Sequence, residues 1–265
     1  MANASIGPTG HFSSRFSARL QQSARVLKNE GARRFLELSA LSLIEPVRSL
    51  RLRVAVAADA RGVLLKIRNG KHGRGLFIDC GSNIGQGYEF FSKYYRKEHF
   101  DYIMIEPNKN CIPYLEALRD RSGANIDIIA KAASVRDGFA RLFGPPSDRA
   151  EPIYEGRSIV PEHNNSLYQT DNTAADIVET FSLSQLILDK SQFYDVVILK
   201  MDVEGAEYEL LLDMIESRAH RKLYAAYIEF HSIYMKDKDR NIRRKMEYDL
   251  KKDIGKDDIL LREWI

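Results

Sequence analysis

Three carboxylates of the sequence stand where chemistry on a small ligand could take place. Asp79, Glu106 and Asp202 each follow a run of apolar residues that is typical of a buried strand. In sheets of parallel strands, ligands bind at the edge where the carboxyl ends of the strands meet. Carboxylates at that edge would accept hydrogen bonds from hydroxyl or amino groups, so the sequence predicts a ligand site there.

The turn after Asp79 differs from a dinucleotide fingerprint. That fingerprint carries three glycines as G-x-G-x-x-G around a pyrophosphate, whereas here an acid precedes Gly81 and polar residues separate Gly81 from Gly85. The acid would repel a pyrophosphate but suits S-adenosylmethionine, which presents an ammonium, a sulfonium and a ribose diol. Similar turns also occur in α/β proteins that bind no cofactor. The candidate cofactor residues of the turn are Asp79, Cys80, Gly81, Ser82, Asn83, Gly85 and Gln86.

A second group of candidates follows the next two predicted strands. Glu106 lies 21 residues beyond Gly85, where dehydrogenases and methyltransferases place an acid that accepts both ribose hydroxyls. An adenine ring would lie at the end of the third strand. The candidates for ribose and adenine are Glu106, Pro107, Asn108, Lys131 and Ala132.

The candidate catalytic residues are Asp202, Glu204, Glu229 and His231, at the ends of the fourth and fifth predicted strands. His231 could act as a base at neutral pH. The carboxylates would orient an acceptor, or Asp202 and Glu229 would hold a divalent metal ion. Asp202 is also a candidate cofactor contact. The structural alternative is an ion pair between Lys200 and a carboxylate that only anchors the turn.

Alternation of apolar runs and helical patterns predicts a parallel sheet with helices on both faces. Strands are expected over residues 76–78, 102–106, 126–130, 194–202, 223–231 and 259–265. Helices are expected over residues 87–95, 107–121, 208–216 and 241–254, and a short strand and helix over residues 178–188.

Residues 1–70 are expected to form a tail, a helical extension and a short β pair. Apolar residues recur at helical intervals over residues 16–44, Pro46 would end the last helix, and residues 54–58 and 62–67 would pair as strands. Residues 1–74 carry 14 Lys and Arg against 4 Asp and Glu. The helices could cover the cofactor, pack on the sheet or form a homodimer; an organelle transit peptide is the alternative.

Residues 71–265 would then form the catalytic domain. Between residues 140 and 176 the pattern dissolves into Gly, Pro and Asn, which is typical of a substrate lid or of disorder. Arg141, Arg149 and Arg157 would bind a phosphate or carboxylate of the acceptor, if it carries one.

The composition argues against a disulfide-rich or a membrane-spanning protein. An apolar share of 44% in 265 residues is ordinary for a globular chain, and two cysteines make no disulfide framework. No apolar run reaches the roughly 20 residues of a membrane-spanning helix. We therefore expect a cytoplasmic protein, with Cys80 a packing residue.

Four motifs together resemble the FkbM-type methyltransferase family. They are Asp79-Cys80-Gly81-Ser82-Asn83-Ile84-Gly85, Ile105-Glu106-Pro107-Asn108, Lys200-Met201-Asp202-Val203-Glu204-Gly205-Ala206-Glu207 and Ile228-Glu229-Phe230-His231. The resemblance implies a Rossmann-like class I fold with a mostly parallel seven-stranded sheet and S-adenosylmethionine as methyl donor. It further implies O-methylation of a small-molecule or carbohydrate acceptor.

Other functions remain as alternatives at this stage. A nicotinamide-dependent oxidoreductase would share Glu106, and a noncatalytic scaffold would keep the fold alone. The Asn/Asp-Pro-Pro-Tyr/Phe motif of base-modifying methyltransferases is missing after the fourth strand, so no nucleic acid is expected as a partner.

Overall fold

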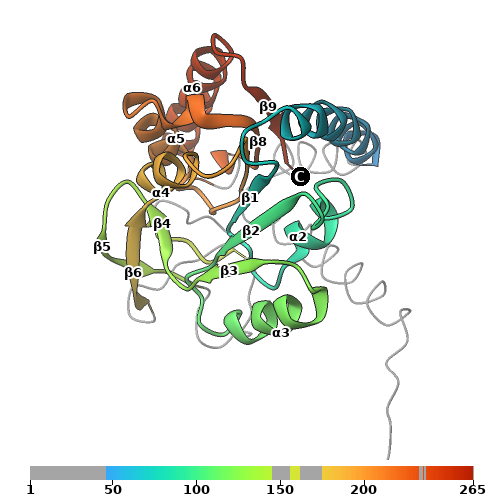
Figure 1. Cartoon of the computed structure of the whole chain (residues 1–265). Helices are drawn as coiled ribbons and strands as arrows, with labels where there is room; N and C mark the ends of the chain where they lie inside the picture. The colour runs from blue at the N-terminus through green and yellow to red at the C-terminus, as the bar shows by residue number, and fades with distance from the viewer. Residues whose placement is uncertain (1–45, 145–155, 162–174, 233–234, 236, 265) are drawn as a thin grey trace, which may run out of the picture.

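The computed structural model describes residues 46–144, 156–161, 175–232, 235 and 237–264 of the chain. Its central layer is a six-stranded sheet with the order β3-β2-β1-β7-β8-β9 (Figure 1). The strands are β1 (Gly75–Cys80), β2 (Phe100–Ile105), β3 (Ile126–Ile129), β7 (Val196–Met201), β8 (Leu223–Ile228) and β9 (Leu260–Glu263).

Every neighbouring pair in this sheet is parallel. The predicted α/β class and parallel sheet are therefore confirmed, and the order reverses between β1 and β7, as in doubly wound sheets. The predicted number of strands is wrong for the described residues, which contribute six to this sheet. After the last helix the chain returns as the single parallel edge strand β9 and forms no final hairpin within the described residues.

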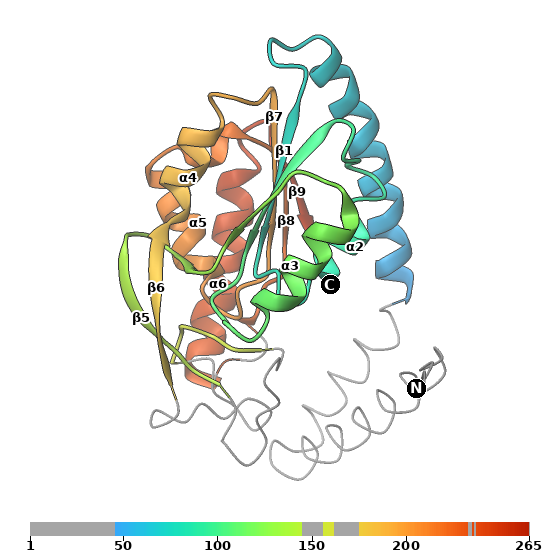
Figure 2. The same cartoon turned by 60° about the horizontal axis from the view of Figure 1, so that its bottom comes forward.

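Helices cover both faces of the sheet (Figure 2). One face carries the helical segment over residues 46–68, α2 (Gln86–Phe91) and α3 (Ile112–Ser122). The other face carries α4 (Leu183–Lys190), α5 (Glu207–Glu216) and α6 (Asp237–Ile254), with the short 3-10 helix η1 (Ala219–Lys222) before β8.

Side chains of the strands alternate between two hydrophobic cores. In β1, Leu76 and Ile78 join the core under α4, α5 and α6, whereas Phe77 joins the core under α2 and α3. In β7, Leu199 joins the core under α4, α5 and α6, and Ile198 joins the core under α2 and α3. Strands buried on both faces must be apolar throughout, which explains the continuous apolar runs of the sequence.

The segment over residues 46–68 is helical, so the predicted β pair at residues 54–58 and 62–67 is wrong. Pro46 is the first described residue of this helical segment, and the helix that it was predicted to end lies outside the described residues. Leu52, Val56, Val63 and Ile67 are buried at intervals of four or seven residues and pack in the core under α2 and α3. The β-branched residues favoured a strand by propensity, but burial of one helical face outweighs that weak preference. The helices and homodimer contacts expected before residue 46 lie outside the described residues.

A second, three-stranded sheet has the order β4-β6-β5. It consists of β4 (Ala132–Ser134), β5 (Gly138–Leu142) and β6 (Asp176–Ser182). Because β5 pairs with β6, residues 140–142 and 176 form strands, so the patternless stretch is shorter than predicted. Residues 145–155 and 162–174 of the expected lid lie outside the described residues.

Among the described helices, none combines the length and apolar character that crossing a membrane requires.

Candidate functional site

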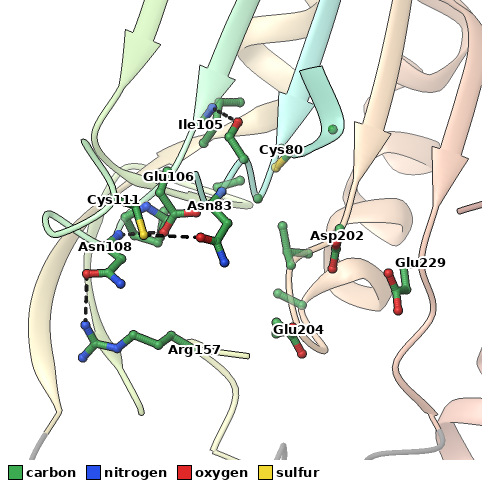
Figure 3. Close-up of a pocket in the computed structure, with 18 of the residues that line it drawn as sticks. Cys80, Asn83, Ile105, Glu106, Asn108, Cys111, Arg157, Asp202, Glu204 and Glu229 are labelled. Carbon is green, nitrogen blue, oxygen red and sulfur yellow. Dashed lines mark hydrogen bonds between the residues drawn. The ribbon is translucent and has the colours of Figure 1, made fainter. Parts of the chain in front are cut away.

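A cavity of about 360 Å³ opens at the carboxyl ends of β1, β2, β7 and β8. It lies beside the point where the strand order reverses, the place where doubly wound sheets bind ligands. Its volume is at the small end of the range of ligand pockets. Figure 3 shows two groups of polar side chains on opposite sides of it, Glu106 with Asn83 and Asn108 on one side and Asp202 with Glu229 on the other.

The turn after β1 is fixed by hydrogen bonds to the end of β2. The backbone N–H groups of Gly81 and Ser82 both donate to the Ile105 carbonyl at 3.0 Å. Gly81 has φ +81°, and a Cβ atom there would lie 1.7 Å from the Asp202 carbonyl oxygen. Gly81 lines the cavity, and a glycine is also required there because the tips of β1 and β7 approach so closely.

Glu106 occupies the position predicted for a ribose-binding acid. Its two carboxylate oxygens accept from the backbone N–H groups of Asn83 and Asn108, both at 2.8 Å. Burial raises the pKa of Glu106, and these two hydrogen bonds oppose that rise. Asn83 itself adopts φ +46°, a left-handed conformation that is strained outside glycine. The carboxylate is therefore held at the cavity wall by backbone geometry.

Asp79 lies beneath the cavity and does not line it. Because Ile78 and Cys80 face one core, Asp79 points to the opposite face, where a Cβ on Gly87 would lie 2.6 Å from Asp79 Oδ2. Its partner is Lys200 Nζ, at 3.2 Å from Asp79 Oδ1. The predicted direct contact of Asp79 with the cofactor is thus replaced by a buried ion pair.

Lys200 joins the tips of β1 and β7. Its ammonium donates to the Gly81 carbonyl at 2.8 Å and lies 3.4 Å from Asp202 Oδ2. Burial alone would lower the pKa of Lys200, but Asp79 and Asp202 outweigh burial and raise it. The anchoring ion pair kept as the structural alternative is therefore present, although Lys200 also reaches the cavity.

Most of the predicted cofactor residues line the cavity. Those that do so are Cys80, Gly81, Ser82, Asn83, Gln86, Glu106, Pro107, Asn108, Ala132 and Asp202. Gly85 does not: its own carbonyl begins α2, and a Cβ there would meet Leu118 of α3 at 2.3 Å. Lys131 does not either, because it is exposed and pairs with Glu179 at 2.6 Å. Burial raises the pKa of the Cys80 thiol, which agrees with a packing role.

The four predicted catalytic side chains converge on the opposite wall. His231 Nε2 lies 3.3 Å from Glu204 Oε2, 3.6 Å from Asp202 Oδ1 and 3.9 Å from Glu229 Oε1. Glu204 reaches this position with φ +52° in the turn after β7. Side chains 27 residues apart in sequence are thus brought together because β7 and β8 are parallel neighbours.

Charges on this wall affect one another. Burial raises the pKa of Glu229 to about 7, and repulsion from Asp202 adds to the rise. Burial alone would lower the pKa of His231, but Glu204 and Glu207 outweigh burial and raise it well above its usual value. Such an arrangement can hold a proton, a cation or a polar acceptor.

Among the three arginines proposed for acceptor binding, Arg157 lines the cavity. Its Nη1 lies 3.4 Å from Asn108 Oδ1 and its Nη2 lies 2.8 Å from Asp176 Oδ2, on the Glu106 side (Figure 3). Arg141 is exposed on β5, and Arg149 lies outside the described residues. Arg157 can therefore reach a ligand in the cavity, and its expected role toward the acceptor stays a prediction.

Sequence reasoning missed Cys111 and Trp264 in the cavity lining. Trp264 follows β9 and packs against Phe90 and Phe91, with ring centroids 5.2 and 5.0 Å apart. As the one tryptophan of the chain it could have been noticed in the sequence, whereas its contact with Phe90 and Phe91 arises only in the fold. No pattern in the sequence marked Cys111.

Comparison with known proteins assigns the chain that forms this cavity to a family. The chain matches the Methyltransferase FkbM domain over residues 79–252. No curated protein matches the chain. A crystal structure of methyltransferase FkbM from Methylobacillus flagellatus KT is 16% identical, with a TM-score of 0.41, over 68% of this chain and 37% of that one. This chain thus spans little more than a third of that protein.

Proposed function

Since the chain belongs to the FkbM methyltransferase family, we propose that this methyltransferase moves the methyl group of S-adenosylmethionine to a hydroxyl oxygen of a sugar, glycoconjugate or natural product. The observation that carries the proposal is the division of one cavity into two walls. One wall offers a fixed carboxylate beside a backbone turn, and the other offers a histidine among carboxylates.

The Glu106 wall suits the nucleoside of the cofactor. Its carboxylate is already oriented by two backbone N–H groups and retains lone pairs that can accept from a ribose diol. Asn108 and Ala132 lie beside it along the cavity, where the adenine would extend. The turn at Gly81 and Ser82 continues toward Asp202, so the methionine end would lie between the two walls.

The opposite wall suits the acceptor. S-Adenosylmethionine supplies an electrophilic methyl group, which an acceptor oxygen must approach in line. Asp202 and Glu229 would accept hydrogen bonds from the acceptor hydroxyls and hold one oxygen in that line, which supplies much of the rate. The hydroxyl proton would pass to the carboxylates around His231, of which Glu204 lies 3.3 Å and Glu229 lies 3.9 Å from His231 Nε2. The products are a methyl ether and S-adenosylhomocysteine.

We also propose that residues 140–176 help to close the cavity over the acceptor. In the described part of that stretch, Leu142, Gly156, Arg157 and Ile159 line the cavity. Arg157 bridges Asn108 and Asp176, so it connects this stretch to the cofactor wall.

Calorimetry on the full chain tests the proposal against a nicotinamide-dependent oxidoreductase. S-Adenosylmethionine and S-adenosylhomocysteine should bind, whereas NAD and NADP should not, because the turn after β1 lacks the three-glycine fingerprint of a pyrophosphate site. A panel of sugars and hydroxylated natural products should then yield S-adenosylhomocysteine in the presence of donor. Binding of NAD without binding of S-adenosylhomocysteine would overturn the proposal, and cofactor binding without turnover of any acceptor would favour a scaffold.

A further inference from the structure

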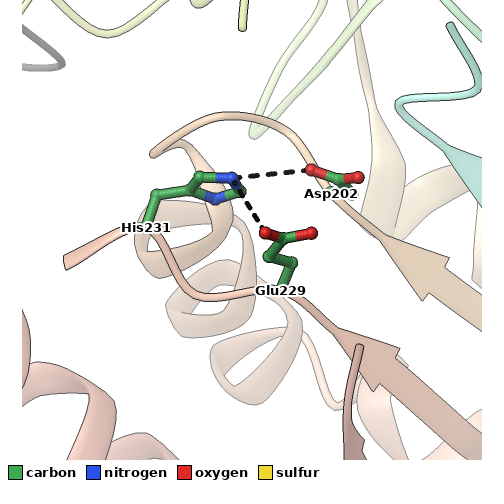
Figure 4. Close-up of side chains that lie close together, drawn as sticks. All are labelled: Asp202, Glu229 and His231. Carbon is green, nitrogen blue, oxygen red and sulfur yellow. Dashed lines mark ion pairs between the residues drawn. The ribbon is translucent and has the colours of Figure 1, made fainter. Parts of the chain in front are cut away.

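Asp202, Glu229 and His231 bring their ligand atoms together at the acceptor wall. One donor atom from each lies within 4.8 Å of the other two, and Figure 4 shows His231 Nε2 facing the carboxylates of Asp202 and Glu229. The carboxylates are about one-quarter exposed and the imidazole is buried. Two oxygen ligands and one nitrogen ligand therefore meet on the side that opens to the cavity.

Glu207 fixes the histidine from behind. Its Oε1 accepts from the His231 backbone N–H at 2.7 Å and lies 3.2 Å from His231 Nδ1. Its Oε2 accepts from the Gly205 backbone N–H at 2.8 Å, and the side chain is fully buried. A carboxylate on one ring nitrogen, with the other nitrogen facing further ligands, is the usual support of a metal-binding histidine.

Several carboxylates gather around one imidazole on this wall. Glu204, Asp202 and Glu229 all lie within 3.9 Å of His231 Nε2. Lys200 is 3.4 Å from Asp202 but also serves the buried Asp79 at 3.2 Å. Carboxylates gathered away from water are costly unless cations compensate them.

We propose that Asp202, Glu229 and His231 form a divalent cation site, with Glu207 as its positioning residue. Mixed carboxylate and imidazole ligands suit Mn²⁺ or another divalent ion of the first transition row. The role of the cation rests on the proposed function: it would bind the acceptor hydroxyl and lower the pKa of that group. The hydroxyl proton would leave to a carboxylate or to water, and the oxygen would then attack the methyl carbon and release S-adenosylhomocysteine as the methyl–sulfur bond breaks.

Electron paramagnetic resonance with Mn²⁺ tests the site without any acceptor. On chelator-treated full chain, the signal of free Mn²⁺ should fall as one ion binds. Glu229→Gln and Asp202→Asn should each weaken binding at least tenfold, and Glu207→Gln should weaken it less. The matched control is Glu209→Gln, an exposed residue on α5 that pairs with Arg243, and it should bind as the wild type does.

Calorimetry with S-adenosylhomocysteine on the same samples separates this proposal from the proposed function. Glu229→Gln should retain that binding, which also shows that the variant is folded. Wild-type protein that leaves Mn²⁺ free, or a Glu229→Gln variant that binds it with unchanged affinity, would overturn the cation site. If the wild-type protein does not bind S-adenosylhomocysteine, the cofactor assignment is overturned instead.

Discussion

The carboxylate of Glu106 is held in place by hydrogen bonds from the backbone N–H groups of Asn83 and Asn108. We expect Glu106→Gln to weaken S-adenosylhomocysteine binding by about 1.5–3 kcal/mol, roughly 10- to 150-fold, because hydrogen bonds to a charged acceptor are lost. Calorimetry measures the change. Glu116→Gln, on the exposed side of α3, serves as the control. Equal affinity of the Glu106 variant and the wild type would contradict the ribose assignment.

Lys200 and Asp79 neutralise each other inside the sheet. Replacing Lys200 by Met should lower the free energy of unfolding by about 3–5 kcal/mol, because a buried carboxylate loses its partner. Adding Asp79→Asn to Lys200→Met should recover part of that loss, since the uncompensated charge is then removed. Urea denaturation of the two variants measures both effects. A double variant no more stable than Lys200→Met would show that the pair does not act through charge.

At the residue scale, the sequence predicted those site residues whose positions depend only on following a strand of the sheet. Glu106, Asp202, Glu229 and His231 line one cavity because parallel strands bring their carboxyl ends together. Asp79 was misplaced although period-two alternation with Ile78 and Cys80 already pointed it to the other face.

At the element scale, the tips of β1 and β7 touch at Gly81. A methyl group there would lie 1.7 Å from the Asp202 carbonyl oxygen, so Gly81→Ala should force these strand ends apart. Gly73→Ala is the matched control, because Gly73 also has a positive φ, +67°, but has nothing within 4 Å of an added Cβ. We expect Gly73→Ala to lower the free energy of unfolding by about 1 kcal/mol, from backbone strain alone. Gly81→Ala should lower it clearly more, as measured by urea denaturation. Equal losses would contradict the close contact.

The opposite edge of the sheet is tied by Asp101 of β2. It accepts from Arg74 Nε at 2.8 Å and from Tyr194 Oη at 3.0 Å. Burial alone would raise the pKa of Asp101, but Arg74 and its other hydrogen bonds lower it below 3.8. The stabilisation is therefore present above pH 3.8 and is lost as the pH falls through the lower folded-state pKa. Acid titration of Asp101→Asn should lack this part of the stability loss; an unchanged acid profile would contradict the assignment.

The same scale explains why residues 46–68 were misassigned as partly β. Val54 and Val56 are adjacent members of an alternating, β-branched pattern, yet Val54 is 64% exposed and Val56 is fully buried on a helix. Alternation over so few residues fits both a strand and a helix. The burial of Leu52 and Ile67 in the same core decides for the helix.

At the scale of the whole molecule, the two ends of the described chain complete one fold. Asp59, in the helical segment, accepts two hydrogen bonds from Arg262, which lies in β9, and one from the hydroxyl of Tyr227 in β8. Both Asp59 and Arg262 lie outside the residues that match the family. These contacts, together with the shared core, indicate that residues 46–68 pack as one unit with the sheet. Measurements of stability can therefore test whether a domain boundary lies at residue 70, as predicted.

Paired substitutions in the helical segment test that boundary. Val56→Asp places a carboxylate in the core under α2, where Val56 is 0% exposed, and should lower the free energy of unfolding by several kcal/mol. Val54→Asp puts the same group on the solvent face and should change stability by about 0.5 kcal/mol or less. Fluorescence of Trp264, at the far end of the chain, reports unfolding of the sheet. If residues 1–70 formed a separate unit, Val56→Asp would leave the Trp264 transition in urea where Val54→Asp leaves it.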